Sequence, residues 1–231
     1  MSAHITPIAD GACAIELAGE TVLLLPEKAL FWPRLRLLAV ADIHFGKAAA
    51  FRALGVPVPG GTTADNLERL DRLLAAHGVA HLVFLGDFLH AKAARAPATL
   101  AELASWRGRH PALRLTLVRG NHDLHAGDPP EALGIAVADE PFALAPFQFC
   151  HHPELDAPGY VLAGHVHPVF HLAAGRDALR LPCFVAGGRR AILPSFGAFT
   201  GGHALRLAGD DKLYLVAGDK VLPHAMLNAG R

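Results

Sequence analysis

The chain has 231 residues, 52% of them hydrophobic, which is enough to bury one substantial core and predicts a single domain over residues 1–231. Lys and Arg together number 21, as do Asp and Glu, so the net charge excludes a uniformly basic protein, and any attraction for nucleic acid must come from a local patch. The three cysteines are widely spaced and form no C-x-x-C pair, which argues against a disulfide framework and against a cysteine-ligated zinc site.

The first half of the chain alternates strand patterns with helix patterns. Two segments of alternating polarity flank the turn Ala18-Gly19-Glu20 and predict a hairpin, while leucines recur at helical spacing after Thr63. In chain order we predict strands Cys13–Leu17, Thr21–Leu25 and Leu35–Ala41, a helix from Thr62 or Thr63 to His77, a strand His81–Leu85, a helix Pro97–Arg109 and a strand Leu113–Val118.

From Ala136 onward the pattern changes to short strands separated by tight turns. The predicted strands are Phe147–Cys150, Tyr160–Ala163, Val169–Leu172, Cys183–Ala186, Ala204–Leu207 and Leu213–Val216. We therefore expect an α/β fold in which two mixed β-sheets pack face to face and are flanked by helices.

Five polar clusters stand directly after predicted strands. They are Asp42-Ile43-His44, Gly86-Asp87, Gly120-Asn121-His122-Asp123, Cys150-His151-His152-Pro153 and Gly164-His165-Val166-His167. Open α/β sheets place their sites at the carboxyl ends of strands. A D-x-H or H-x-H in an extended segment would aim both side chains to one side, so that two ligands reach one ion.

The residue types of these clusters predict a particular chemistry. Carboxylates, imidazoles and one amide oxygen form a mixed oxygen and nitrogen set that suits Mn, Fe or Zn. Two such ions about 3.5–4 Å apart can share a hydroxide that attacks a phosphate ester in line. Histidines away from the clusters, such as His81, are expected at the surface or at helix ends.

The order of the clusters resembles the calcineurin-like metallophosphoesterase superfamily, whose signature is DxH, GD, GNH, H and GHxH along the chain. The resemblance implies a four-layer sandwich fold and two metal ions. It places Asp42, His44, Asp87 and His167 on the first ion and Asp87, Asn121, His151 and His165 on the second, so that Asp87 bridges them.

The same resemblance assigns catalytic roles beside the metals. Asn121 and His122 would stabilise the charge on the phosphate, and His122 would protonate the departing oxygen. Many members carry an acidic residue after the GD block that orients this histidine; here His90 stands there, and Asp123 is a weak substitute. The resemblance favours His151 over His152 as the ligand, because His152 is followed by Pro153, and leaves His152 near the phosphate.

The segments around Asp42, Phe51 and Asp87 resemble the PdeM family of bacterial ligase-associated DNA damage response endonucleases. This resemblance implies a manganese-dependent phosphodiesterase that acts on DNA, single-stranded DNA in particular, in association with a helicase, a nuclease-like protein and an ATP-dependent DNA ligase. Lys47, Arg52 and Arg119 follow metal-bearing strands and are candidates for phosphate contacts, the alternative being solvated surface charge.

Two other functions remain open at this level. The same chemistry could act on a small nucleotide or on a phosphoprotein, and the fold could serve as a non-catalytic metal-binding interaction module. The first residues lack a basic region followed by an apolar one, and no apolar run approaches the roughly 20 residues of a membrane span, so we expect a cytoplasmic protein.

Overall fold

The N-terminal half of the chain forms the first sheet. The computed structural model describes residues 6–7, 11–58, 61–174, 177–198, 200–205, 207 and 209–225. The strands of the first sheet lie side by side in chain order: β1 (Thr6–Pro7), β2 (Cys13–Leu17), β3 (Glu20–Leu25), β4 (Ala29–Trp32), β5 (Leu37–Ala41), β6 (His81–Leu85), β7 (Arg114–Val118) and β8 (Ile135–Ala138). Strands β1 to β5 pair antiparallel and β5 to β8 pair parallel, so this sheet is mixed.

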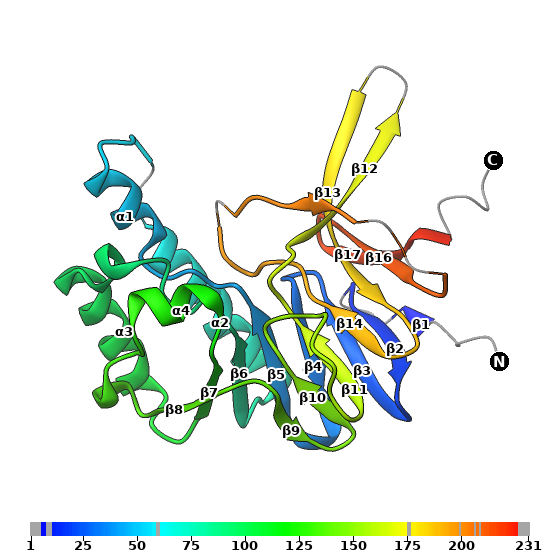
Figure 1. The fold of residues 1–231 in the computed structure, drawn as a ribbon, viewed down its shortest axis with the longest axis horizontal. Coiled ribbons are helices and arrows are strands. Elements are labelled where there is room, and N and C mark those ends of the chain that lie inside the picture. The colour runs from blue at the N-terminus through cyan, green and yellow to red at the C-terminus, as the bar shows by residue number, and fades with distance from the viewer. Residues whose placement is uncertain are drawn as a thin grey trace.

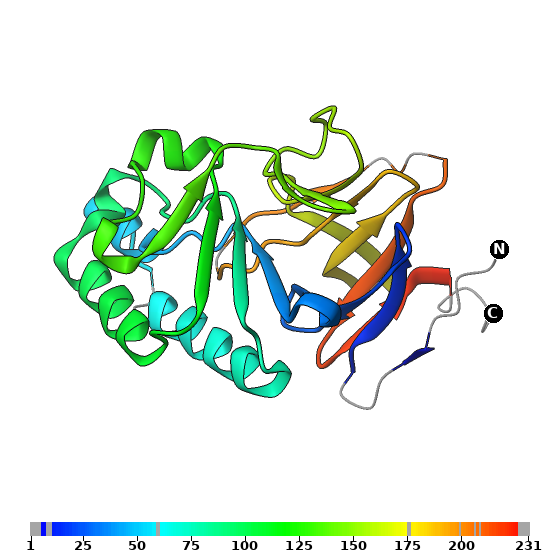
Figure 2. The ribbon, with the colours of Figure 1, turned by 90° about the horizontal axis from the view of Figure 1, so that it is seen from below.

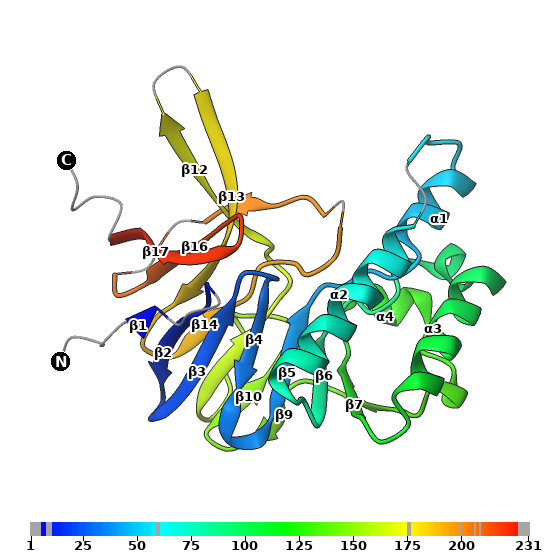
Figure 3. The ribbon, with the colours of Figure 1, turned by 180° about the vertical axis from the view of Figure 1, so that it is seen from behind.

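The described helices lie on the outer face of the first sheet, on one side of the molecule (Figures 1 and 2). They are α1 (Lys47–Ala53), α2 (Thr62–His77), α3 (Pro97–Arg109) and α4 (Asn121–Ala126), with single 3-10 turns η1 (Pro33–Leu35), η2 (Lys92–Arg95) and η3 (Glu131–Leu133). Parallel neighbours need a crossover connection, and α2 and α3 provide those that join β5 to β6 and β6 to β7. Figure 3 shows α2 over the strands of this sheet.

The C-terminal half forms a second mixed sheet that packs on the other face of the first. Its strands lie in the order β15 (His203–Ala204), β12 (Pro168–Ala174), β13 (Asp177–Ala186), β14 (Arg190–Ile192), β11 (Tyr160–Ala163), β10 (Phe147–Phe149) and β9 (Phe142–Leu144), with β16 (Lys212–Ala217) and β17 (Lys220–Pro223) continuing from β13. The hairpin of β12 and β13 extends beyond the body of the molecule, on the side where α1 also lies (Figure 1).

Strand β5 shows how the two-residue repeat divides the core. Leu38 and Val40 belong to the apolar cluster that α2 and α3 cover, whereas Leu37, Ala39 and Ala41 belong to the cluster between the two sheets. All five residues are fully buried because both faces of the strand are covered, which gives β5 the continuous apolar run of a central strand.

Most sequence predictions are confirmed. The hairpin β2–β3, the helices α2 and α3 and the strands β6 and β11 occur where the pattern predicts them, and the face-to-face sandwich of two mixed sheets is present. None of the described helices is both long and apolar enough to cross a membrane.

Some predicted boundaries are wrong for identifiable reasons. The strand predicted from Leu35 begins at Leu37, because Pro33–Leu35 form a 3-10 turn and Arg36 is left-handed with φ 49°. The strand predicted over Ala204–Leu207 is a short bridge at His203–Ala204, and Arg206 lies outside the described residues. His81 is buried rather than exposed, with its Nε2 2.9 Å from the Thr116 hydroxyl.

Candidate metal centre

The five polar clusters meet because the strands before them end at the same level. In the first sheet, Ala41, Leu85 and Val118 are the last residues of β5, β6 and β7 and lie in register across the parallel pairs. In the second sheet β10 and β11 are parallel, and Gly164 N–H donates to the His151 carbonyl at 3.1 Å just beyond them. The candidate ligands of both sheets therefore face one another across the edge of the sandwich.

The backbone at the candidate ligands is left-handed. Positive φ angles occur at Asp42 (52°), His44 (49°), Asp87 (52°), His165 (70°) and His167 (50°). The prediction that D-x-H and H-x-H lie in extended segments is therefore wrong, since the chain turns sharply at each strand end. Left-handed backbone is uncommon outside glycine and costs about 1–3 kcal/mol per residue, and its concentration here marks a functional site.

Two glycines of the clusters allow the strand ends to approach closely. A Cβ on Gly86 would lie 2.0 Å from His151 Nδ1, and a Cβ on Gly164 would lie 2.7 Å from the Asp42 carboxylate. Both contacts are shorter than any ordinary van der Waals distance. These positions accept only glycine if the two sheets are to present their donors to a common centre.

Asp42, His44 and His167 form the first group of donors. One ligand atom from each lies within 4.8 Å of the others. His167 Nε2 lies 3.5 Å from Asp42 Oδ1, and His44 Nε2 lies 3.6 Å from Asp87 Oδ2. Among the described residues, the buried nitrogens His44 Nδ1 and His167 Nε2 have no hydrogen-bond partner. Buried donors and acceptors are normally paired, so these nitrogens indicate that a further group completes the site.

The second group is built around the fully buried His151. Its Nε2 lies 2.9 Å from Asn121 Oδ1, 2.9 Å from His165 Nδ1 and 3.6 Å from Asp87 Oδ1. Asp42, Asp87 and His151 also lie within 4.8 Å of one another, so the two carboxylates stand between the two groups. This arrangement fits two neighbouring cations, with Asp87 in reach of both.

The charges of the centre fit cations as well. Asp42 and Asp87 are 0% and 3% exposed, and the ion pairs found for them in the described part of the chain involve only histidines. Burial raises the pKa of Asp87, which reflects the cost of an uncompensated carboxylate. Burial also lowers the pKa of His151 to about 4, which keeps the imidazole neutral, as a metal ligand must be.

His122 is oriented by a backbone carbonyl. Its Nδ1 lies 2.8 Å from the His90 carbonyl oxygen, and its ring stacks on the His90 ring with 5.2 Å between centroids. A carbonyl only accepts, so the proton must be on Nδ1, and Nε2 is left to face the centre, 3.9 Å from Asp87 Oδ2. The acidic residue that the sequence lacks at position 90 is thus replaced by the main chain.

Asp123 does not orient His122. Its buried carboxylate accepts hydrogen bonds from Phe88 N–H at 2.9 Å and from Gly120 N–H at 2.9 Å. It therefore ties the loop after β6 to the start of α4. This contact keeps the cluster that contains Asp87 and the cluster that contains Asn121 at a fixed distance.

A cavity of about 620 Å³ lies over Asn121 and His122, between α4 and η2. Lys92 and His125 line its rim. Lys47, on α1, is close enough that Asp87 and Asp42 act electrostatically on its ammonium group, although burial lowers its pKa. Arg52 is exposed on the same short helix.

The other two candidate phosphate contacts, Arg119 and His152, are held by carboxylates in different ways. The Arg119 guanidinium bonds both carboxylate oxygens of Asp128 at 2.8 Å and Asp139 at 2.6 Å. His152 Nδ1 lies 2.5 Å from a Glu140 carboxylate oxygen, while its ring stays beside the centre, 4.8 Å from the His151 ring and 4.6 Å from the His165 ring. Arg119 is therefore not available to a phosphate without breaking these bonds, whereas the Glu140 contact of His152 uses only Nδ1 and leaves its Nε2 for other contacts.

Sequence reasoning missed two residues that support the centre. Glu140 accepts hydrogen bonds from the backbone N–H groups of His151 and His152 at 2.8 and 3.0 Å. The Ser195 hydroxyl donates to the Asp42 carbonyl at 2.9 Å. The Glu140 contact spans 11 residues and the Ser195 contact spans 153, and no local pattern in the sequence indicates either.

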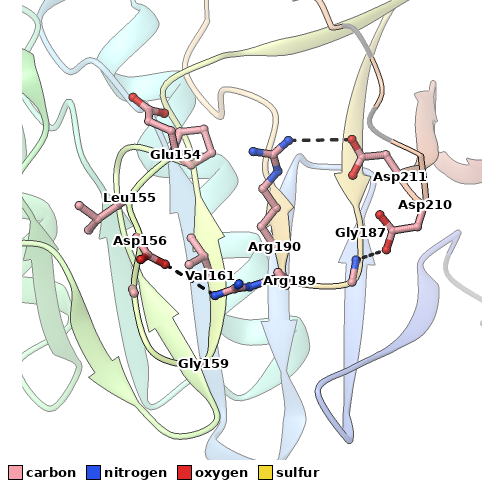
Figure 4. A pocket seen from close by; sticks show the side chains of 13 residues that line it. Glu154, Leu155, Asp156, Gly159, Val161, Gly187, Arg189, Arg190, Asp210 and Asp211 are labelled. Carbon is pink, nitrogen blue, oxygen red and sulfur yellow. Dashed lines mark hydrogen bonds and ion pairs between the residues drawn. The ribbon is translucent and has the colours of Figure 1, made fainter.

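A separate pocket of about 490 Å³ lies beside β11 and β14 (Figure 4). Its two arginines face carboxylates: Arg190 lies 4.0 Å from Asp211, and Arg189 lies 3.6 Å from Asp156. Because Glu154 and Asp210 also line it, acidic side chains outnumber basic ones. This pocket is unsuited to a phosphate group.

Comparison with known proteins agrees with this geometry. The family described as calcineurin-like phosphoesterase matches residues 35–151. The crystal structure of the Pseudomonas putida nuclease MPE is 50% identical, with a TM-score of 0.82, and the match covers 92% of this chain and 99% of that one. A search of curated proteins gave no match.

Two more distant structures were also found. The Escherichia coli phosphoesterase YfcE is 15% identical with a TM-score of 0.40, covering 80% of this chain and 95% of that one. The Aquifex aeolicus protein AQ665 is 18% identical with a TM-score of 0.38, covering 57% and 78%. At these scores neither carries an argument.

Proposed function

The chain belongs to the calcineurin-like phosphoesterase family, and from this membership and the geometry of its centre we propose that it is a binuclear phosphodiesterase that cuts DNA. It is a metal-dependent phosphoesterase. The observation that carries the finer proposal is the convergence of His151 Nε2, Asn121 Oδ1 and His165 Nδ1 beside the two buried carboxylates Asp42 and Asp87.

In this proposal Asp42, His44, Asp87 and His167 hold one cation, and Asp87, Asn121, His151 and His165 hold the other. When bound, two such cations lower the pKa of water and neutralise phosphate oxygens. The mixed oxygen and nitrogen donors suit Mn, Zn, Fe or Mg, and the resemblance of the flanking segments favours Mn.

The protein's own side chains would complete the chemistry. His122, held through Nδ1 by the His90 carbonyl, presents Nε2 to the phosphate and, when protonated, donates to the departing oxygen. Asn121 stands beside it and would hold one of the cations through its Oδ1, which lies 2.9 Å from His151 Nε2. Lys47 adds positive charge on the side of the centre that faces α1.

The choice of DNA rests on two supports. A relative that is 50% identical over 92% of this chain is described as a nuclease. Lys47, Arg52 and Lys92 stand on the elements that border the centre and its cavity. Single-stranded DNA is the proposed form, and association with a helicase, a nuclease-like protein and an ATP-dependent ligase is proposed from the sequence resemblance.

The test is hydrolysis by metal-stripped protein with Mn, Zn, Mg or nothing added back. The substrates are a labelled single-stranded DNA and a small aryl phosphodiester, and the control is Asn121→Ala. We expect metal-restored cleavage of both substrates and none by the control. Cleavage of the small ester alone would refute DNA as the substrate, and no hydrolysis with any metal would refute the enzyme.

A further inference from the structure

A second, smaller pocket shares a wall with the metal centre. It has a volume of about 170 Å³ and is lined by His167, Ser195 and Gly197, by Pro168 at the base of the β12–β13 hairpin, and by Lys28 and Arg180. His167 belongs to the first donor group, and the Ser195 hydroxyl and the Gly197 N–H both donate to the Asp42 carbonyl. The pocket therefore lies directly beside the centre, on its His167 side.

Lys28 is the first basic group of the pocket. It lies in the turn between β3 and β4 in the left-handed conformation, φ 68°, and its Nζ lies 3.5 Å from the Gly197 carbonyl. No ion pair of Lys28 is found among the residues that the structure describes. Burial and the nearby Arg69 lower its pKa to about 7. Lys28 is half-buried, and a partly desolvated charge without a partner is costly, so an anion brought into this pocket would stabilise its charged form.

Arg180 supplies a second cation from another direction. It lies on β13, opposite His171 in the projecting hairpin (Figure 1), and the described residues that line the pocket include no carboxylate. The contrast with the pocket of Figure 4 is direct, since there Arg189 and Arg190 face aspartates. Within the described part of the chain neither Lys28 nor Arg180 has an ion pair, and a pocket of about 170 Å³ with these two basic groups has the size and charge for one phosphate group.

We propose that the pocket of Lys28 and Arg180 binds the phosphodiester next to the scissile one on the same DNA strand. This inference rests on the proposed function. Binding of this neighbouring phosphate makes the enzyme prefer a substrate with at least two consecutive phosphodiesters over one with a single phosphodiester. The metal centre would then cut the strand while the pocket fixes its register.

The experiment compares two thymidine substrates, a dinucleotide with one phosphodiester and a trinucleotide with two, with Mn added. The readout is the ratio of their kcat/KM values, because a partly inactive preparation lowers both values and leaves the ratio unchanged. In the wild-type protein we expect kcat/KM to be about tenfold higher for the trinucleotide than for the dinucleotide. The gain should shrink to about twofold or less in Lys28→Met and in Arg180→Gln.

Arg189→Gln is the matched control, because it removes the same charge from the pocket of Figure 4 and should keep the wild-type ratio. A readout without turnover is the salt dependence of oligothymidine binding in chelator, whose slope should fall by about 0.7 for a lost phosphate contact. Arg180 is exposed, so its variant tests the pocket even if Lys28→Met fails to fold.

Two results would overturn the proposal: an unchanged ratio in Arg180→Gln, or an equal fall in Arg189→Gln. In either case a wild-type protein that still cleaves both substrates would leave the phosphodiesterase function intact. Loss of all wild-type hydrolysis would instead refute the proposed function itself.

Discussion

Asp87→Asn should have opposite effects on stability in the metal-free and metal-loaded protein. The carboxylate is 3% exposed, and burial raises its pKa above the unfolded value, so the charged form at pH 7 opposes folding when no cation is present. Asparagine keeps the side-chain oxygen that accepts the hydrogen bond from the backbone N–H of His122, 3.0 Å away, and removes the charge. Removing the buried charge should raise the free energy of unfolding of the metal-free protein by about 1 kcal/mol or more, which raises its Tm by roughly 2–4 °C in a chain of this size.

The metal-loaded protein should show the reverse. Cations at one hundred times their Kd stabilise the wild type by about 2.7 kcal/mol, or roughly 5–10 °C in Tm, and an amide cannot bridge two of them. The assay is thermal melting at pH 7 in chelator and in added Mn, with Asp156→Asn as the control, because that side chain is 97% exposed. A metal-free Asp87→Asn that melts below the wild type, or that keeps the full Mn shift, would refute the reasoning.

Three further changes test separate parts of the argument. His122→Ala should lower kcat by about 10²–10⁴-fold with metal content unchanged in elemental analysis, and retention of activity within tenfold would remove its proposed role. Gly86→Ala should lose bound metal, because its Cβ would lie 2.0 Å from His151 Nδ1; full metal content would contradict the close packing of the two sheets. Burial lowers the pKa of His81 to about 4, so between pH 7.5 and pH 5 this histidine takes up a proton in the unfolded state but not in the folded one. The free energy of unfolding should therefore fall by about 2 kcal/mol over this pH range. Denaturant unfolding should show this loss in the wild type and not in His81→Gln.

Elements whose apolar residues recur at a regular spacing could be predicted from the sequence. Elements whose conformation depends on tertiary contacts could not. Helix α2 has leucines at helical spacing and a glycine, Gly78, at its end, so its bounds agree with the prediction. Helices α1 and α4 are short and have no such repeat. Helix α4 begins within the polar cluster at Asn121, where the sequence gives the chemistry of the residues but not their backbone conformation.

The candidate site was predictable in its membership and not in its geometry. Residue types and order identify the donors, because parallel strands must end together at one edge. The left-handed turns at Asp42 and His165, and the use of the His90 carbonyl to orient His122, depend on how the two sheets meet. Glu140 and Ser195 were missed for the same reason, since each acts through a backbone group that only the fold brings near.

The placement of charge bears on how a chain with no net charge would bind the DNA proposed as its substrate. Several arginines are neutralised in place: Arg34 by Glu20, Arg109 by Asp71 and Arg119 by Asp128 and Asp139. Beside the centre Lys28 and Lys47 have no ion pair within the described part of the chain. Pairing therefore concentrates the uncompensated positive charge where the phosphates would lie, and a local field of this kind steers a strand more effectively than the same charge spread over the surface.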